Sequence, residues 1–376
     1  MNKKKVFKII RNISIVLAII LAIGIIIFKN TIGVKFPELK GTPEIGKWYS
    51  ISPDEAKDSE GNEWHGLLKL GTENKVVVYF FGGGVSITGE TSEGGREFYA
   101  TSTKYQDMVA TWGIGSNKDE NPFKDWTFLV LPYSTGDFHT GTGEYKYTDS
   151  EGKEQTVYHN GYNNYSSFIE EAKKYVGEPD TLLVTGFSAG GFATSLLADD
   201  VIDHFPSVTN TTVAIDSSLL LYDDWQNTAE NLWKSPKEIS DRLAGDNIVL
   251  DSLVALKNKR GKDVKILFDC SIRDNTLSQY QSYIREGEMI DNKTNGDIFQ
   301  KDLKQMVEDL QENIDDIGIY IWDLGRNEET QNTQHTILSS SLFEKLESNK
   351  SVSDWLIDAV NGEVKSYGLN LLDKQY

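Results

Sequence analysis

Six apolar, β-rich runs alternate with helical patterns along this chain, and that alternation limits the possible fold more than any other feature. The runs span residues 75–81, 126–132, 181–186, 211–216, 264–269 and 317–323. Most are almost continuously apolar, as is typical of parallel strands buried on both faces. Helical patterns lie between them at 163–176, 190–204, 236–257 and 301–314. We therefore predict an α/β fold with a mostly parallel, doubly wound sheet.

Two connecting segments are longer than a simple crossover between parallel strands requires. They span residues 218–262 and 275–316. In open sheets of this kind, ligands bind at the carboxyl ends of the strands. We therefore expect that either segment could contribute a lid over a site at that edge.

The first 45 residues differ in character from the rest. An uncharged run from Ile13 to Phe28 approaches the ~17 residues that a helix needs to cross a bilayer. Five basic side chains precede it, which places that flank in the cytoplasm by the positive-inside rule. We interpret residues 1–12 as a cytoplasmic basic segment, 13–29 as a transmembrane signal anchor, 30–45 as a tether and 46–376 as a folded extracellular domain on the cell membrane. The alternatives are a cleaved signal peptide and a buried core helix.

The charge excludes nucleic acid as a partner. Residues 1–35 carry seven Lys or Arg and no acid, so the remaining 341 residues carry 31 basic and 57 acidic side chains, a net charge of −26. A surface that acidic repels phosphate backbones. The one cysteine, Cys270, excludes a disulfide framework and a cysteine-based zinc site. An exported domain without disulfides suits a bacterial cell surface.

The strongest chemical signal is the stretch around Ser188. The run 181–186 leads into Gly186-Phe187-Ser188-Ala189-Gly190, and an amphipathic helical pattern follows. A G-x-S-x-G turn between a strand and a helix is the setting of a nucleophile elbow, in which the serine hydroxyl lies at the helix N-terminus. The alternative is a glycine-rich turn with an inert serine. The elbow favours Ser188 as the nucleophile.

Acyl transfer also needs N–H donors that bind the developing oxyanion. In this arrangement one donor is the N–H that follows the nucleophile, here that of Ala189. Others follow an earlier strand, where the sequence has Gly82-Gly83-Gly84 directly after the run VVVYFF. We predict Gly83, Gly84 and Ala189 as the donors. The alternative for the glycines is a flexible turn.

The general base should come late in the chain, because these folds run Ser, then acid, then His. Of the five histidines only His335 follows a late strand, in the polar loop GRNEETQNTQHT. For the acid, the loop after the penultimate strand is the commoner position, which favours Asp274. Asp216, at the end of TTVAID, is the second candidate, and Asp269 and Asp323 are further ones.

Asp137 and His139 follow the run WTFLVLPY and should lie at the same edge of the sheet. We weigh two roles for them equally. One is contact with the substrate or support of the oxyanion loop. The other is a turn in which Asp137 binds nearby main-chain amides. His139 has no partner at metal-ligand spacing, so we expect no metal site.

At these residues the sequence resembles the pectin acetylesterase family. The matching segments are FFGGGVS (81–86, with the phenylalanine before it), PYSTGDFHTG (132–141), 157–163, GFSAGG (186–191), AIDSS (214–218) and QHTIL (334–338), in the family's order. Val85 stands where the family usually has tryptophan, and Ser86 and Ser134 stand where plant and animal members usually have cysteine. The resemblance covers roughly residues 75–340.

The resemblance implies an α/β-hydrolase-like serine esterase with no metal and no organic cofactor. Ser188 matches the family's nucleophile, His335 its histidine and Asp274 its acid. It implies removal of acetyl or other short acyl groups from an acylated glycan or a small ester outside the cell. The acidic charge opposes a polyanionic pectin as substrate. Two other hypotheses stay open: a lipid or general carboxylesterase, and a catalytically inactive, membrane-anchored glycan-binding protein.

Overall fold

The computed structural model describes residues 35–346 and 349–376. The predicted cytoplasmic segment and signal anchor, residues 1–29, lie outside these ranges. Among the described residues, no helix is both long enough and apolar enough to span a bilayer.

Part of the predicted tether packs onto the domain. The N–H of Leu39 donates to Ser50 O (2.8 Å) and the N–H of Ser50 donates to Pro37 O (2.9 Å). The ring of Phe36 stacks on Trp48, with ring centroids 5.7 Å apart. Residues 37–39 are extended and pair with the edge of the sheet, and the ring of Phe36 packs on it. The contacts of the folded domain therefore begin before residue 46.

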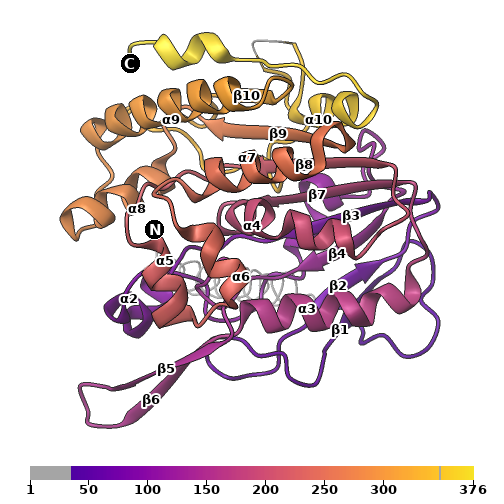
Figure 1. The fold of residues 1–376 in the computed structure, drawn as a ribbon, viewed down its shortest axis with the longest axis horizontal. Helices are drawn as coiled ribbons and strands as arrows, with labels where there is room; N and C mark the ends of the chain where they lie inside the picture. Colours follow the sequence, from indigo (N-terminus) through magenta and orange to yellow (C-terminus); the bar gives the residue numbers. More distant parts are fainter. Residues whose placement is uncertain (1–34, 347–348) are drawn as a thin grey trace, which may run out of the picture.

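One eight-stranded sheet forms the centre of the molecule (Figure 1). In spatial order its strands are β1 (Trp48–Ile51), β2 (Gly66–Lys69), β4 (Thr127–Leu131), β3 (Lys75–Phe80), β7 (Thr181–Phe187), β8 (Asn210–Asp216), β9 (Val264–Ser271) and β10 (Gly318–Trp322). From β4 to β10 neighbouring strands are parallel, whereas β2 pairs antiparallel with both β1 and β4. All six predicted strands are confirmed as the parallel part of the sheet.

Four strands were not predicted. β1 and β2 have four residues each, too few to form a distinctive apolar run. β5 (Gly143–Thr148) and β6 (Glu154–His159) form a separate antiparallel hairpin that projects from the body of the molecule (Figure 1). In β5 half-buried and exposed positions alternate, so the hairpin carries none of the apolar signal of a core strand.

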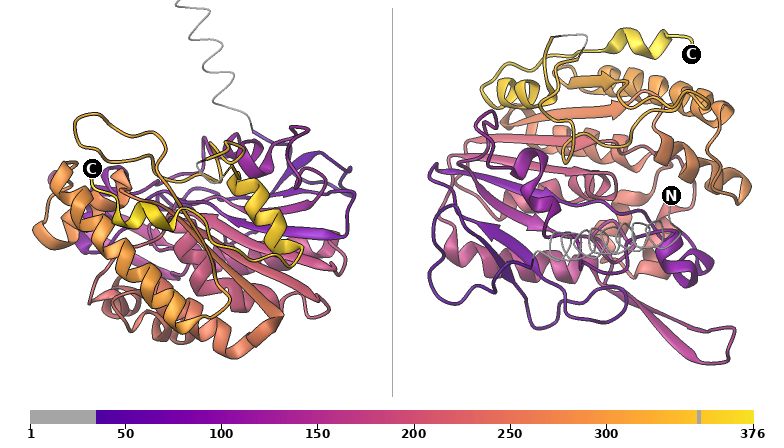
Figure 2. Two further views of the ribbon diagram at one scale, coloured as in Figure 1. Left: turned by 90° about the horizontal axis from the view of Figure 1, so that it is seen from above. Right: turned by 180° about the vertical axis from the view of Figure 1, so that it is seen from behind.

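The helices cover both faces of the sheet. They are α2 (Gly89–Gly94), α3 (Gly161–Ala172), α4 (Ala189–Asp203), α5 (Trp225–Asn227), α6 (Lys237–Ser240), α7 (Ile248–Arg260), α8 (Asn275–Glu286), α9 (Lys293–Asn313) and α10 (Val352–Val360). Helices α3, α4 and α7 lie in front of the sheet in Figure 1, and α10 lies on the opposite face, as the view from above in Figure 2 shows. This layering confirms the doubly wound α/β sheet, of α/β-hydrolase-like form.

The helices differ from the predicted patterns in three places. The helix predicted at 301–314 begins eight residues earlier, at Lys293. The pattern at 236–257 is two helices, α6 and α7, because Asn247 starts a new helix: its side chain accepts a hydrogen bond from the N–H of Leu250. Helix α8 was not predicted. It begins at Asp274, whose carboxylate caps it in the same way, so a residue predicted only as a loop acid is also a helix cap.

Because the strands are parallel, their carboxyl ends meet at one edge of the sheet. The residues that follow β3, β4, β7, β8 and β9 include every predicted site residue except His335, which lies in the connection after β10. The fold therefore gathers at one edge residues that are up to 250 positions apart in sequence.

Candidate active site

Ser188 occupies a sharply turned backbone between β7 and α4. Its φ and ψ are 55° and −128°, a region that residues with a side chain rarely adopt. A side-chain carbon at Gly186 would overlap the carbonyl of Gly190, and one at Gly190 would overlap the carbonyl of Phe80. Both glycines are therefore required for the close approach of helix and strand, as the elbow interpretation expects.

Asp274 and His335 lie in direct contact. Asp274 Oδ2 accepts a hydrogen bond from His335 Nδ1 at 2.7 Å. The other oxygen, Oδ1, accepts from the N–H groups of Thr276 (3.0 Å) and Leu277 (2.9 Å) at the start of α8. The carboxylate is fully buried, and the helix N-terminus stabilises its negative charge. This arrangement orients the imidazole with Nδ1 protonated and leaves Nε2 free to accept a proton.

The other candidate acids do not bind the imidazole. Asp216 Oδ2 accepts from the main-chain N–H groups of Ile337 (2.8 Å) and Leu338 (2.9 Å), just beyond the histidine. Asp269 accepts from a tryptophan indole, and Asp323 forms ion pairs with an arginine and a lysine. Of the four acids considered from the sequence, the structure therefore brings only Asp274 into hydrogen-bond contact with the ring.

The electrostatic surroundings raise the pKa of His335. Burial lowers the pKa of the imidazole, but the charge of Asp274, its hydrogen bond and the charge of Asp216 all raise it and outweigh the burial. His335 Nε2 is buried and has no hydrogen-bond partner among the described residues. No hydrogen bond joins it to Ser188 Oγ within 35–346 and 349–376. Catalytic hydrogen bonds of this kind are often loose before a substrate binds.

The glycine loop after β3 lies against the elbow. A side-chain carbon at Gly82 would stand 2.6 Å from Ser188 Cβ, so the backbone of this loop passes directly over the serine. In the described chain, the N–H groups of Gly83, Gly84 and Ala189 form no hydrogen bond with another group. Unpaired N–H groups at the elbow, and in the loop that passes over it, are the type of donor that an oxyanion requires.

His139 and Asp137 form hydrogen bonds that stabilise the main chain next to this loop. His139 is neutral at pH 7, because burial lowers its pKa to about 4, and Nε2–H donates to Phe81 O (3.0 Å), the residue before the glycines. The buried Asp137 carboxylate accepts from the N–H groups of His139, Gly141 and Gly161 and from a threonine hydroxyl. All these bonds hold main chain in place.

A cleft of about 530 Å³ opens beside Gly83. It is lined by the segment 96–102, by Lys104 and Tyr105, and by Tyr280 of α8. The Tyr280 hydroxyl donates to Phe98 O, which fixes one wall. A second hollow of about 390 Å³ adjoins the first and shares Arg96, Ser102 and Lys104 with it. This segment could not be predicted from the sequence, because it belongs to no strand or long helix.

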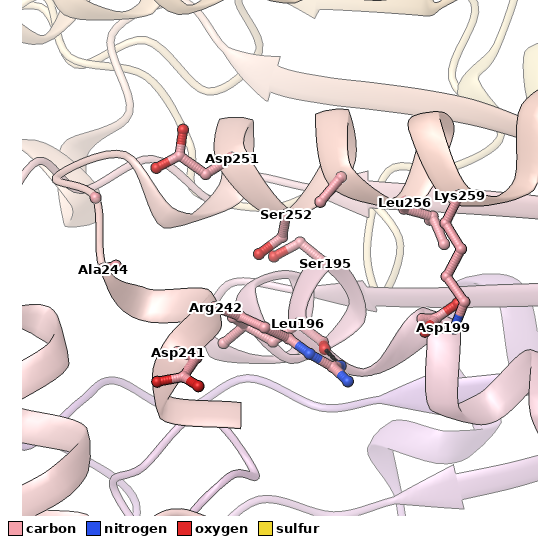
Figure 3. A pocket seen from close by; sticks show the side chains of 12 residues that line it. Ser195, Leu196, Asp199, Asp241, Arg242, Ala244, Asp251, Ser252, Leu256 and Lys259 are labelled. Carbon is pink, nitrogen blue, oxygen red and sulfur yellow. Dashed lines mark hydrogen bonds and ion pairs between the residues drawn. The ribbon is translucent and has the colours of Figure 1, made fainter. Parts of the chain in front are cut away.

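Another pocket, of about 360 Å³, lies between α4, the α6 region and α7 (Figure 3). It contains Ser195 and Leu196, two turns along α4 from the elbow, and Arg242, which is ion-paired with Asp200. None of the predicted site residues lines it. In the described ranges, no group of three or more His, Cys, Asp or Glu side chains is arranged to hold a metal ion.

Comparison with known proteins identifies a family and a fold that this chain resembles. Residues 69–239 match the family model described as Pectinacetylesterase. The matched range contains the glycine loop and Ser188 but ends before Asp274 and His335. The resemblance to the pectin acetylesterase family is thereby confirmed.

A solved structure with the same fold is that of the Wnt deacylase Notum from Drosophila. The two chains superpose with a TM-score of 0.59 at 14% sequence identity, and the match covers 85% of this chain and 95% of that one. At this identity the similarity establishes the fold alone, which supports an α/β-hydrolase-like sheet across most of the described residues.

We predict that kcat/KM falls on acidification. A histidine that acts as base must be neutral, so activity is complete above its pKa and declines tenfold per pH unit below it. Because the pKa of His335 is raised, the midpoint should lie above that of an unperturbed histidine. A pH profile of kcat/KM for a short-chain nitrophenyl ester measures it. A profile flat through the neutral and mildly acidic range would contradict the assignment.

We also predict that Asp274→Asn lowers kcat by roughly 10²–10⁴ with little change in KM. The amide keeps the shape of the side chain, but it removes the charge that stabilises the imidazolium and permits the wrong tautomer. Asp119→Asn, at an exposed ion pair with Lys124, is the matched control for loss of one carboxylate. Thermal melts of both variants show whether the chain is folded. A folded Asp274→Asn protein with wild-type kcat would remove Asp274 from the mechanism.

Proposed function

We propose that this protein is a serine carboxylic-ester hydrolase that removes acetyl or other short acyl groups from a glycan. Its residues 69–239 match the pectinacetylesterase family. The observation that carries this proposal is the 2.7 Å contact between Asp274 and His335 at the sheet edge where Ser188 follows β7. A base held by a buried carboxylate near a strained serine is the arrangement that activates a hydroxyl for attack on an ester.

The proposed reaction has two steps. Ser188 Oγ attacks the ester carbonyl while His335 Nε2 takes the hydroxyl proton, and Asp274 stabilises the imidazolium that results. The carbonyl oxygen becomes an oxyanion next to the N–H groups of Ala189, Gly83 and Gly84. The C–O bond to the alcohol then breaks, and His335 returns its proton to the departing oxygen. In the second step His335 takes a proton from water as the water oxygen attacks the acyl-serine; the acyl–Oγ bond then breaks, His335 returns the proton to Ser188 Oγ, and the carboxylic acid is released.

The cleft beside Gly83 supports a sugar as the alcohol part of the ester. Its lining combines hydroxyl and charged groups with aromatic rings, and Tyr105 is 52% exposed there. Aromatic faces of this kind can stack on sugar rings, whereas a long acyl chain needs an enclosed, mostly apolar cavity. The adjoining hollow gives room for further sugar units. A lipid or general carboxylesterase and an inactive glycan-binding protein are the competing functions.

We propose that the enzyme works outside the cell, anchored in the membrane by residues 13–29. The basic flank and the uncharged run support this location. The folded domain has a strongly acidic sequence, and its single cysteine is buried. It therefore needs no reducing agent to stay folded, which suits a location outside the cell.

The first experiment tests the chemistry. Full-length protein in mild detergent should be labelled by a fluorophosphonate probe, and Ser188→Ala should abolish the label and lower kcat by at least ~10³. Acetate release from a panel of acetylated oligosaccharides, beside nitrophenyl esters of increasing chain length, identifies the acyl group. Activity that rises with acyl length would favour the lipid esterase. Absence of both label and hydrolysis in a folded protein would favour the binding protein.

A substitution in the cleft distinguishes binding of the sugar from binding of the acyl group. Tyr105→Ala should raise KM for an acetylated oligosaccharide several-fold and leave nitrophenyl acetate almost unaffected, because only the sugar reaches that ring. Trp112→Ala, which removes an aromatic ring that is 45% exposed and lies outside the cleft, is the matched control for loss of an exposed ring. Equal effects of Tyr105→Ala on both substrates would argue against a sugar in the cleft.

The location is tested on intact cells. Protease added to the outside should remove the domain and leave a small membrane-bound fragment, since residues 46–376 are proposed to face outwards. A cytoplasmic protein serves as the control for cell integrity. If the domain is degraded only after lysis, it faces the cytoplasm.

A further inference from the structure

Asp216, at the end of β8, binds two separate parts of the candidate site. Its main-chain oxygen accepts a hydrogen bond from the N–H of Ser188 at 2.9 Å. Its side-chain Oδ2 accepts from the N–H groups of Ile337 and Leu338 at 2.8 and 2.9 Å. These two residues follow His335 closely in the chain. One buried residue thus connects the backbone of the nucleophile to the loop of the histidine.

Both connected segments are strained. Ser188 and Thr336 have φ values of 55° and 61°, and Ser217, next to Asp216, has 52°. Residues with side chains adopt this region at a cost of order 1–3 kcal/mol and hold it only where surrounding contacts impose it. The N–H groups that Asp216 accepts come from the residues directly after Thr336. The bonds of Asp216 are therefore among the contacts that maintain the strained turns on either side of it.

Asp269 lies beside Asp216 in the sheet. The two residues are register partners on β8 and β9, both are fully buried, and the charge of Asp216 acts on the carboxyl group of Asp269. Asp216 Oδ1 and Asp269 Oδ2 are buried and have no hydrogen-bond partner in the described ranges. Two adjacent buried carboxyl groups cannot both be ionised without a large penalty. A single proton between them removes the repulsion and satisfies both oxygens.

The hydrogen-bond donors decide which group holds the proton. Burial raises the pKa of both carboxyl groups, but Asp216 accepts two main-chain N–H bonds that favour its charged form, whereas Asp269 accepts only the indole N–H of Trp322 at 3.2 Å. Burial and the neighbouring Asp216 raise the pKa of Asp269 well above its usual range. Asp269 is therefore the neutral partner.

The other titratable groups that face Asp216 are Tyr79 on β3, Cys270 on β9 and His335. Burial raises the pKa of both Tyr79 and Cys270, so neither carries a charge at neutral pH. His335, faced by Asp274 and Asp216, is the group that gains positive charge during the proposed reaction. The negative charge of Asp216 therefore also favours protonation of His335.

We propose that Asp216, held as a carboxylate by a protonated Asp269, is a positioning residue that fixes the His335 loop against Ser188. It acts through His335 and touches neither substrate nor the transferred proton, which passes between Ser188 and His335 while the proton on Asp269 stays in place. The inference rests on the proposed esterase function for its kinetic consequences. The shared proton and the loop contacts are independent of that function.

The test compares Asp216→Asn with Asp269→Asn in the full-length protein. Asp216→Asn should lower kcat by roughly 10–100-fold with KM within about twofold, because a small displacement of a catalytic group carries a loss of that size. It should also move the acidic limb of kcat/KM to lower pH, since one of the charges that raises the pKa of His335 is gone. Asp269→Asn should lose far less, because an amide N–H can replace the shared proton.

Counting active sites with the fluorophosphonate probe corrects kcat for misfolded protein. If Asp216→Asn only lowers the melting temperature, and the correctly folded fraction keeps wild-type kcat and pH profile, the role is structural and the proposal is wrong. If Asp216→Asn loses activity while Asp274→Asn keeps it, Asp216 is itself the triad acid, which also overturns the proposal. Equal or larger losses in Asp269→Asn would reject the assignment of the proton.

A second measurement needs neither activity nor a foldable Asp216 variant. The ¹³C carboxyl spectrum of aspartate-labelled wild-type protein should contain one carboxyl that remains protonated at neutral pH, and Asp269→Asn should remove that signal. A spectrum without a protonated carboxyl would overturn the shared proton. If the wild-type protein hydrolyses no ester while this signal is present, the esterase function fails and the paired carboxyl groups stand.

Discussion

The strained turn at Ser188 is the constraint on which the site depends. The serine can hold its backbone at φ 55° because the surrounding main chain closes around it: β8 accepts its N–H, the glycine loop crosses above it, and α4 starts immediately afterwards. Each contact needs a small residue or a main-chain partner at close range. The turn also leaves the N–H of Ala189 free at the start of α4. Strain in the backbone and a free donor beside the hydroxyl thus arise from the same geometry.

Buried aspartates hold the loops around that turn. Asp137 binds main-chain N–H groups of the connection after β4, Asp216 those beyond the histidine, and Asp274 those at the start of α8. A carboxylate that accepts several such bonds is well stabilised despite its burial. Plant and animal members of the pectin acetylesterase family, which this sequence resembles, usually have a cysteine where Ser86 stands; here Ser86 hydrogen-bonds Ser92. Charged hydrogen bonds to main chain therefore stabilise loops in a chain with one cysteine.

The carboxyl groups do different work although their side chains are identical. Asp274 faces an imidazole, so its charge acts on a group that takes up a proton. Asp216 faces main-chain N–H groups and a second carboxyl, and Asp137 faces main chain and a threonine. The partner that each carboxylate meets, and not its position at the end of a strand, decides which contributes directly to the proposed chemistry. The carboxyl edge of the sheet contains more buried aspartates than one catalytic triad needs, because other aspartates stabilise its loops.

Hydrophobic pattern and local turn chemistry were sufficient for much of this protein. The six parallel strands could be predicted because each is buried on both faces and therefore continuously apolar, and the elbow could be predicted because Gly186 and Gly190 flank a serine between a strand and a helix. Chain order selected His335, and the loop after the penultimate strand selected Asp274; the two side chains lie 2.7 Å apart. The short strands β1 and β2 and the hairpin carry too little apolar pattern to be seen. The two roles of Asp216, the support that His139 gives to Phe81 and the cleft between Gly83 and Tyr280 depend on contacts between residues roughly 30–200 positions apart. Such contacts leave no local periodicity, so only the packing of the sheet edge decided them.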